Sequence, residues 1–310
     1  MLGNRDAAIL FCGKLNKGLR SLGAAEWNEL CSAAEREGIA LEQLLFFSEK
    51  DFTDKLKLDA EFSARLSRLN NGSGEINEKL HAYASVGIKA VTVFDCEYPA
   101  RLTGKLGKSR PPVFYCAGDM GLLNEKVIGF VGSRNANKDD LEFSRFCVER
   151  TASHGYGVVS GGARGVDWEC ELQALRLGKC VVEFPEDNLL KRLNQPEISN
   201  AVNSGKMALV SLAAPDEGFN LGIAMMRNRY IYAQSDGTVV IRSDYNKGGT
   251  WAGATDTLKR GWCKLLCRRK SVYAGNAALI ERGAIPIDYT FDGNVGAIER
   301  PLPPQQLSLF

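Results

Sequence analysis

Apolar residues follow one pattern up to about residue 85 and a different one after about residue 126. In the first stretch they recur three and four positions apart, as at Leu58, Phe62 and Leu66, which is the spacing of amphipathic helices. The polar run Asn-Asn-Gly-Ser-Gly at 70–74 then indicates a loop. We therefore expect residues 1–85 to form a small helical module.

The stretch from residue 86 to 125 has short β-prone runs beside prolines, at 91–99 and 111–115. Proline donates no ladder hydrogen bond, so such runs are typical of edge strands or extended connections. We expect this stretch to be a connector that leads into a second domain.

After residue 126, apolar runs of strand length alternate with stretches of helical periodicity. The run at 127–131 is continuous, as in a strand that is buried on both faces of a parallel sheet. The runs at 155–159 and 180–184 are expected as the second and third strands. Further elements are expected as strands at 207–211, 238–242 and 271–274 and as helices at about 218–234 and 250–261. This alternation predicts an α/β fold over 126–290, a Rossmann-like, doubly wound, mostly parallel sheet preceded by the small helical domain.

The composition excludes several classes of protein. Hydrophobic residues make up 45% and charged residues 25% of the chain, as in ordinary globular proteins. No apolar run approaches the roughly 18 residues of a membrane span, and the first residues lack the order of a signal peptide. We therefore expect a cytoplasmic protein without a membrane partner. Nine cysteines without a CxxC pair favour reduced thiols over a disulfide framework.

The chain has few residues of the types that catalytic and metal sites commonly use. The histidines are His81 and His154, too few for common metal sites, so we expect no catalytic set, no metal and no cofactor. Asp167 could act as an acid, but it stands beside Gly165 at an expected helix start, where a carboxylate caps free amides. The formal charge of +2 carries no global nucleic-acid signature, so a DNA site must come from local clustering.

Three glycine-rich turns stand at expected strand ends or helix starts, at 132–134, 161–167 and 248–250. In a doubly wound sheet, ligands bind beyond the carboxyl ends of the strands. Glycine permits close backbone approach, amides at helix starts attract anions, and Arg134 and Arg164 add forked donors. The turns together predict an anion or phosphate pocket. Any one of them alone is equally consistent with a plain tight turn beside a solvated arginine.

Several ordered motifs between residues 98 and 284 resemble the DNA-processing protein A family (DprA, also called Smf). The most recognisable is Ser-Gly-Gly-Ala-Arg-Gly-Val-Asp at 160–167, and Val-Gly-Ser-Arg at 131–134 is similar to the family's first strand and turn. The other matching segments are Tyr98-Pro99, the Pro-Pro-Val-Phe-Tyr run at 111–115, Arg227-Asn228-Arg229 after Phe219, Leu279-Ile280 and Gly283-Ala284. The chain is identified as a divergent member of this family.

The departures from the family pattern are local. Glu171 stands where the family usually has a histidine, and residues 185–188, Pro-Glu-Asp-Asn, replace a glycine-rich turn. Residues 248–250, Gly-Gly-Thr, stand where the family has Ser-Gly-Ser. The helical module at 1–85 is similar to sterile-alpha-motif or helix-hairpin-helix domains.

The resemblance implies a non-enzymatic protein that binds single-stranded DNA and forms a homodimer. It further implies loading of a RecA recombinase, in DNA uptake, recombination or a mobile-element or defence setting. The DNA- or phosphate-binding residues implied by the turns and the resemblance are Gly132, Ser133, Arg134, Gly161, Gly162, Arg164, Gly165, Arg227, Arg229, Gly248, Gly249 and Thr250. For Arg227 and Arg229, the alternative is internal pairing with Asp or Glu.

A basic run near residue 264 extends the candidate surface. Lys264, Arg268, Arg269 and Lys270 lie close to Trp262 with no acid between them, and a single strand binds to basic grooves with stacking surfaces. A solvated basic face on a helix and strand explains the run alone equally well. Joined to the family motifs, the run favours DNA.

Residues 291–310 are expected to form an extended tail stiffened by prolines. Within it, Gln306-Leu307-Ser308-Leu309-Phe310 resembles the bacterial sliding-clamp-binding pentapeptide at every position. The resemblance implies a sliding clamp as partner, with leucine and phenylalanine filling an apolar pocket. The alternative is a segment that packs on its own domain.

Two further functions fit the same pattern. The runner-up is a nucleotide-derived ligand sensor or a nucleoside-monophosphate phosphoribohydrolase of the wider Rossmann-like group. The enzymes carry a Pro-Gly-Gly-x-Gly-Thr-x-x-Glu element, which residues 248–250 match only in part. No glutamate follows these residues at the helix start, and hydrolysis needs a placed acid or base, so the sequence argues against the hydrolase. A third possibility is a scaffold whose Rossmann-like domain only dimerises. The sensor and the scaffold both predict weak, unselective DNA binding.

Overall fold

The computed structural model describes residues 3–16, 18–186, 188–218 and 221–299. The chain forms two compact units. Unit 1 comprises Met1–Gly118, Asn188–Leu190 and Val210–Glu217, and unit 2 comprises Asp119–Asp187, Lys191–Leu209 and Gly218–Phe310. Within the described residues, no helix combines the length and the apolar character that crossing a membrane requires.

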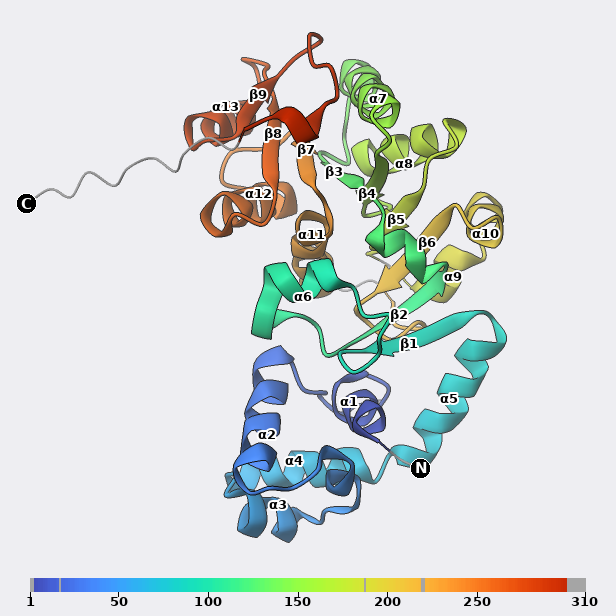
Figure 1. Cartoon of the computed structure of the whole chain (residues 1–310), viewed down its shortest axis with the longest axis vertical. Helices are drawn as coiled ribbons and strands as arrows, with labels where there is room; N and C mark the ends of the chain where they lie inside the picture. Colours follow the sequence, from blue (N-terminus) through green and yellow to red (C-terminus); the bar gives the residue numbers. More distant parts are fainter. Residues whose placement is uncertain (1–2, 17, 187, 219–220, 300–310) are drawn as a thin grey trace, which may run out of the picture. The chain divides into compact units, whose positions relative to one another are not determined.

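Unit 1 begins with the helices that the apolar periodicity predicts (Figure 1). They are α1 (Asn4–Cys12), α2 (Ala24–Arg36), the 3₁₀ helix η1 (Leu41–Phe46), α3 (Glu49–Leu56), α4 (Ala60–Asn70) and α5 (Ser73–Ser85). Their apolar stripes meet in a core that contains the fully buried Phe11, Leu30 and Phe52. The rings of Phe11 and Phe52 meet edge to face with centroids 6.3 Å apart, so the first helix is packed onto the third.

The stretch expected as a connector contains two strands and a helix. Strand β1 (Ile88–Thr92) pairs antiparallel with β2 (Val113–Gly118), and Val91 lies opposite Phe114. Between them in the chain are α6 (Ala100–Leu106) and the short η2 (Gly107–Ser109). Pro99 stands at the N-cap of α6, where the loss of a backbone donor costs nothing.

Unit 2 alternates strands and helices, as its apolar runs predict. In chain order the elements after Gly118 are η3 (Met120–Asn124), β3 (Val127–Val131), α7 (Lys138–Ser153), β4 (Gly157–Ser160), α8 (Val166–Arg176), β5 (Val181–Glu183), α9 (Leu189–Leu193), α10 (Pro196–Asn203), β6 (Met207–Ser211), α11 (Leu221–Gln234), β7 (Gly237–Val240), α12 (Gly248–Arg260), β8 (Lys264–Arg268), α13 (Ala274–Glu281), β9 (Ile285–Ile287) and η4 (Val295–Ala297). The first residues of α9 and the last residues of β6 belong to unit 1. The residues of β3, β4, β5, β6 and β7 are buried throughout. This confirms the run at 127–131 as a strand buried on both faces.

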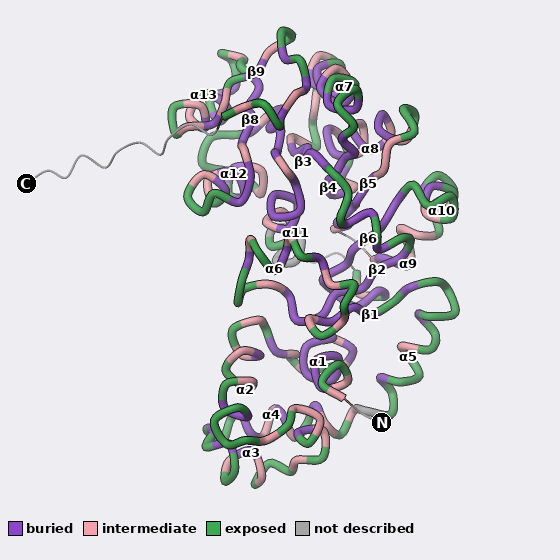
Figure 2. The backbone as a smooth tube through the Cα atoms, viewed as in Figure 1, coloured by how far each residue is buried: buried purple, intermediate pink, exposed green. Residues whose placement is uncertain are grey.

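The parallel strands lie in the order β6-β5-β4-β3-β7-β8-β9 (Figure 1). From β3 the chain moves outward in one direction to β6, and it then returns to place β7 on the other side of β3. Right-handed crossovers therefore put α7 and α8 on one face of the sheet and α12 and α13 on the other. The strands between these layers are buried (Figure 2), and the pattern is the doubly wound, Rossmann-like fold predicted from the sequence.

One expected strand is wrong. Residues 271–274 were expected to be extended, but this stretch is a turn that leads into α13, and the strand is β8 at Lys264–Arg268. Leu265, Leu266 and Cys267 form its buried centre. The charged residues at both ends of this short run gave it the pattern of a basic surface segment and concealed the strand.

The tail expected from residue 291 begins with packed residues. Phe291 and Val295 are buried, and the Nζ of Lys264 donates to the carbonyl oxygens of Val295 and Gly296 at 2.7 and 3.0 Å. Residues 300–310 lie outside the described residues, and so does the candidate clamp-binding peptide at 306–310.

Candidate functional site

A cavity of about 310 Å³ opens beyond the carboxyl ends of β3 and β7. These two strands are neighbours at the point where the strand order reverses, which is where doubly wound sheets bind ligands. Its lining residues come from five segments of unit 2 and are Val131, Gly132, Ser133, Arg134, Ala163, Asp167, Glu186, Arg227, Asn228, Arg242, Ser243, Asp244, Lys247, Gly248, Gly249 and Thr250. All three glycine-rich turns are thus brought together, the one at 161–167 through Ala163 and Asp167.

The glycines of these turns leave room for side chains from α11. A Cβ atom on Gly161 would lie 1.0 Å from the Nη1 of Arg227, so a side chain there would displace the guanidinium. A Cβ atom on Gly249 would lie 2.3 Å from the Nδ2 of Asn228. Gly161 itself contributes by leaving the space in the cavity wall that the Arg227 guanidinium occupies.

Arg227 is a buried cation that faces the cavity, with only 4% of its surface exposed. Its Nη1 lies 3.6 Å from the Oδ2 of Asp167, and its Nη2 lies 3.4 Å from the Oε2 of Glu186. Its Nε and Nη1 atoms find no hydrogen-bond acceptor in the part of the chain that the structure describes. The internal pairing considered for this arginine is present, but it leaves donors unsatisfied.

Asp167 lies in the first turn of α8, whose N-cap is Gly165. Burial raises the pKa of Asp167 to about 6, while the nearby guanidinium of Arg227 acts in the opposite direction. The helix-start position expected for this carboxylate is confirmed. The Asp167 side chain also lines the cavity. The negative charge that it adds to the cavity wall is therefore lost as the pH falls through about 6.

Arg134, in the 132–134 turn, and Arg164, in the 161–165 turn, are both exposed. Arg134 lines the cavity and forms an ion pair with Glu186. Arg164 is exposed and donates through Nη2 to the Oδ1 of Asn135 at 2.9 Å. Arg229 lies with its guanidinium carbon 5.3 Å from the ring centre of Tyr230 and is not among the described lining residues.

The basic run lies apart from the cavity lining. Lys264 binds backbone carbonyls, Lys270 forms an ion pair with Asp139, and Arg268 is 4% exposed and paired with Asp139 and Asp140. The Nη2 of Arg269 lies 3.8 Å from Asp288, and the Arg269 side chain is 65% exposed. None of these four is among the described residues that line the cavity.

A buried acidic cluster supports the 161–165 turn from beneath. The amide of Gly162 donates to Glu171 at 2.9 Å, and Arg192 binds both carboxylate oxygens of Glu183 at 2.7 and 2.6 Å. Burial, with the neighbouring charge of Glu183, raises the pKa of Glu171 well above its usual range. Glu171, which stands where the family usually has a histidine, therefore holds the turn by accepting the hydrogen bond of the Gly162 amide.

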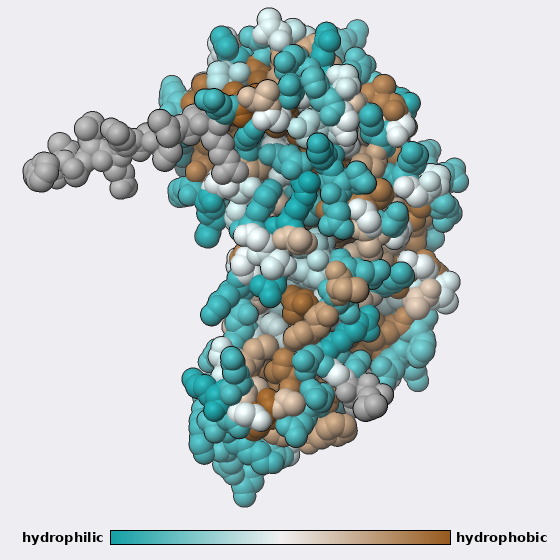
Figure 3. Space-filling model, in the orientation of Figure 1, coloured by the Kyte–Doolittle hydropathy of each residue, from teal (hydrophilic) through white to brown (hydrophobic). Residues whose placement is uncertain are grey.

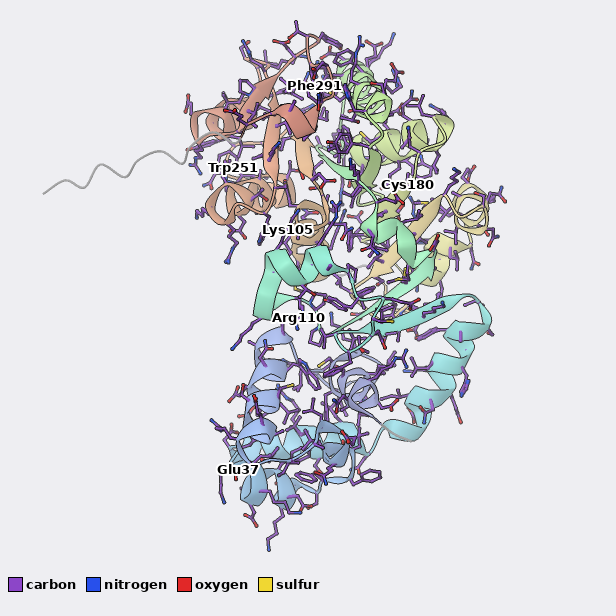
Figure 4. All side chains as sticks on the ribbon, viewed as in Figure 1. Glu37, Lys105, Arg110, Cys180, Trp251 and Phe291 are labelled. Carbon is purple, nitrogen blue, oxygen red and sulfur yellow. The ribbon has the colours of Figure 1, made fainter. Side chains whose placement is uncertain are left out.

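Several cavity residues were missed by the sequence analysis. Glu186 follows β5, and Arg242, Asp244 and Lys247 follow β7. The signal that could have found them is their place directly after strands at the reversal point. Tyr245 also belongs to this segment; it is 56% exposed and its ring packs against Trp251 of α12 with centroids 5.0 Å apart (Figure 4 labels Trp251).

The surface around this region is polar, and hydrophilic residues cover much of the face of unit 2 in Figure 3, with apolar residues scattered among them. In the described residues, no group of histidine, cysteine or acidic side chains is arranged to hold a metal ion. The residues that line the cavity offer arginine, lysine and backbone amide donors to an anion.

Comparisons with known proteins point to one family. The sequence model of the DNA recombination-mediator protein A family matches residues 89–292, which is more than half of the chain. The X-ray structure of DNA processing protein A (DprA) from Streptococcus pneumoniae is similar with a TM-score of 0.70 at 16% identity, covering 92% of this chain and 95% of that chain.

A second solved structure is DNA processing protein A from Helicobacter pylori, which has a single-stranded DNA binding mode. It is similar with a TM-score of 0.54 at 21% identity, covering 65% of this chain and 92% of that chain. A search of curated proteins found no match. At these identities the two structures establish a shared fold.

Proposed function

The chain belongs to the DNA recombination-mediator protein A family, and from this premise we propose that it is a cytoplasmic single-stranded DNA-binding protein that catalyses no reaction of its own. The cavity at the reversal point of the sheet is the proposed phosphate-binding part of its DNA site. The family relationship and the donors of this cavity are independent lines of support.

One observation carries the proposal. Arg227 is a buried guanidinium that faces the cavity and has donors without an acceptor among the described residues. A buried unsatisfied donor on a cation is costly, and a phosphate oxygen would satisfy it with a short, charge-assisted hydrogen bond. Because Arg227 belongs to a motif of the family, the same side chain connects the family relationship to the chemistry.

The cavity has the further donors that a phosphate group needs. Arg134, Arg242 and Lys247 line it together with the first residues of α12. The N-terminus of α12, at Gly248–Thr250, presents free amides and the positive end of the helix dipole. We assign phosphate contacts to Gly132, Ser133, Arg134, Arg227, Gly248, Gly249 and Thr250, and we place Arg164 on the path of the strand beside them.

The finer functional assignments rest on the family relationship. We propose that the protein works as a homodimer and delivers DNA to a RecA-type recombinase, in DNA uptake, recombination or a defence setting. Light scattering at micromolar concentration tests the first part, because a dimer would have about twice the 33.9 kDa mass of the chain. A mass of one chain at all concentrations contradicts the dimer.

The alternative is a sensor of a nucleotide-derived ligand, which the cavity volume of about 310 Å³ favours because it matches the small end of ligand pockets. Binding of labelled single- and double-stranded oligonucleotides over a series of salt concentrations separates the two. A DNA-binding protein prefers the single strand and loses affinity steeply with salt. A sensor binds both oligonucleotides weakly and without preference.

A further inference from the structure

A carboxylate of the protein itself lies where the cavity favours an anion. The Oε2 of Glu186 contacts the Nη2 of Arg134 and lies 3.4 Å from the Nη2 of Arg227. The same cavity is lined by the first residues of α12, which adds the positive end of a helix dipole to these two cations. The Glu186 side chain is 19% exposed, so solvent reaches it.

This carboxylate satisfies Arg227 only in part. Glu186 contacts Arg227 through Nη2, whereas Nε and Nη1 find no acceptor within the described residues. A carboxylate has two oxygens in one plane, and Glu186 also uses its Oε2 for Arg134. A tetrahedral phosphate group presents more oxygens in three dimensions and can meet several guanidinium donors at once.

The charges that line the cavity nearly cancel. The cations Arg134, Arg227, Arg242 and Lys247 face the acids Asp167, Glu186 and Asp244. Glu186 differs from the other two acids because its oxygen is shared by two of the cations. Moving this one carboxylate away uncovers both guanidinium groups, so it controls the positive potential that an incoming anion meets.

We propose that Glu186 occupies the phosphate subsite between Arg134 and Arg227, and that a DNA phosphate binds by displacing its carboxylate into solvent. The inference rests on the proposed function, since it concerns the same cavity. Displacement makes the site selective, because a small or weakly charged anion gains too little to replace a carboxylate that is already in place. Glu186 is thus a specificity-determining residue that keeps the subsite closed to other solutes.

The test compares the full-length protein with Glu186→Gln, which keeps the size of the side chain and removes its charge. The matched control is Glu197→Gln, which removes one negative charge from an exposed position on α10 that does not line the cavity. A fluorescent single-stranded oligonucleotide is titrated with each protein. In parallel, melting temperatures are measured over a series of inorganic phosphate concentrations, and circular dichroism confirms that each variant is folded.

We expect Glu186→Gln to bind the oligonucleotide on the order of tenfold more tightly than the unmodified protein, with Glu197→Gln within about twofold of it. Phosphate should raise the melting temperature of Glu186→Gln more than that of the unmodified protein. If the unmodified protein binds DNA and Glu186→Gln binds equally or more weakly, the displacement idea is wrong.

The two proposals fail in different ways. If neither protein binds the oligonucleotide, the proposed function is wrong. The role of Glu186 is then tested by the phosphate series alone, in which a larger rise in the melting temperature of Glu186→Gln supports it. An equal response of both proteins to phosphate overturns the role of Glu186. A variant that does not fold is replaced by Glu186→Ala, for which the same tighter binding of DNA and phosphate is required.

Discussion

The Nη1 of Arg268 in β8 donates to the Oδ1 of Asp140 in α7 at 2.9 Å, although 128 positions separate the two residues in the chain. Arg268 is 4% and Asp140 is 0% exposed, so this is a buried ion pair. The Arg268 guanidinium also lies 4.4 Å from the ring centre of Phe143 and donates to Asp139 at 2.8 Å. A residue that the sequence marks as part of a basic surface therefore joins a strand to a helix.

Replacing Arg268 by Ala should destabilise unit 2. Removal of one partner of a buried ion pair typically costs about 3–5 kcal/mol of unfolding free energy. Asp140 would keep its contacts with Arg242 and Tyr273. Arg269→Ala is the matched control, because its side chain is 65% exposed and such pairs contribute about 0–1 kcal/mol. Urea denaturation of both variants measures the difference, and similar losses in the two would contradict the structural role of Arg268.

Replacing Arg164 by Ala should weaken single-stranded DNA binding without loss of stability. Arg164 is exposed beside the cavity, and each lost phosphate contact lowers the salt slope of log affinity by about one unit. Arg176→Ala, at an exposed position in the last turn of α8, removes the same charge elsewhere. If both variants show the same slope as the unmodified protein, Arg164 does not contact DNA.

DNA binding should strengthen as the pH falls from about 8 to 5. The pKa of Asp167 is raised to about 6 by burial, so its carboxylate becomes neutral in this range and leaves Arg227 with less internal compensation. The same raised pKa means that the group stabilises the fold fully below about pH 4 and that this contribution is lost as the pH rises through about 6. Asp167→Asn should bind DNA with the low-pH affinity at pH 8. A pH dependence that survives in this variant would assign the effect to another group.

Tyr245 should stack on a DNA base. It is 56% exposed in the segment between the cavity residues Asp244 and Lys247, and base stacking on an aromatic ring contributes about 1–3 kcal/mol. Tyr245→Ala should therefore lower the affinity, and Tyr245→Phe should retain it. Tyr289→Ala removes a ring of similar exposure, 54%, from outside the cavity lining. Equal losses for Tyr245→Ala and Tyr289→Ala would show that the ring near the cavity has no special role.

A peptide of residues 301–310 should bind a bacterial sliding clamp. A short linear peptide buries little area, so micromolar affinity, about −8 kcal/mol, is the expected scale. Replacing Leu309 and Phe310 together by Ala should abolish most of the binding, because apolar anchors typically contribute about 2 kcal/mol or more each. Calorimetry with the peptide measures this. A lower melting temperature for the same double variant of the full chain would indicate that these residues pack on their own domain instead.

The layered fold was predictable because the strands of a parallel sheet carry an unambiguous local pattern. The runs at β3 and β6 are apolar at every position or nearly so, and their boundaries, Val127–Val131 and Met207–Ser211, agree with the expected ranges. Strand β8 lacks this continuous apolar pattern, because Lys264 and Arg268 flank only three apolar residues. The stability of β8 comes from its pairing with β7 and from the distant Asp140, and neither contact leaves a local signal.

The candidate site was predictable to the extent that it is built from turns. Glycine and arginine at the ends of strands mark residues 132–134 and 248–250 as places where an anion fits, and both turns line the cavity. Glu186 and Arg242 were not found, because their roles depend on which strand ends meet at the reversal point. Local sequence also could not separate Arg227, a buried cavity residue, from Arg268, a buried structural one.

The reversal of strand order between β3 and β7 has a consequence for the order in which the protein is made. A ribosome completes β3, β4, β5 and β6, through Ser211, before it begins β7 at Gly237. During that interval the nascent sheet can pair on one side, while the other edge of β3 is open to another chain. The cavity gains its second wall only when β7 and the start of α12 arrive. An emerging chain therefore has no complete cavity until translation has passed the start of α12 at Gly248.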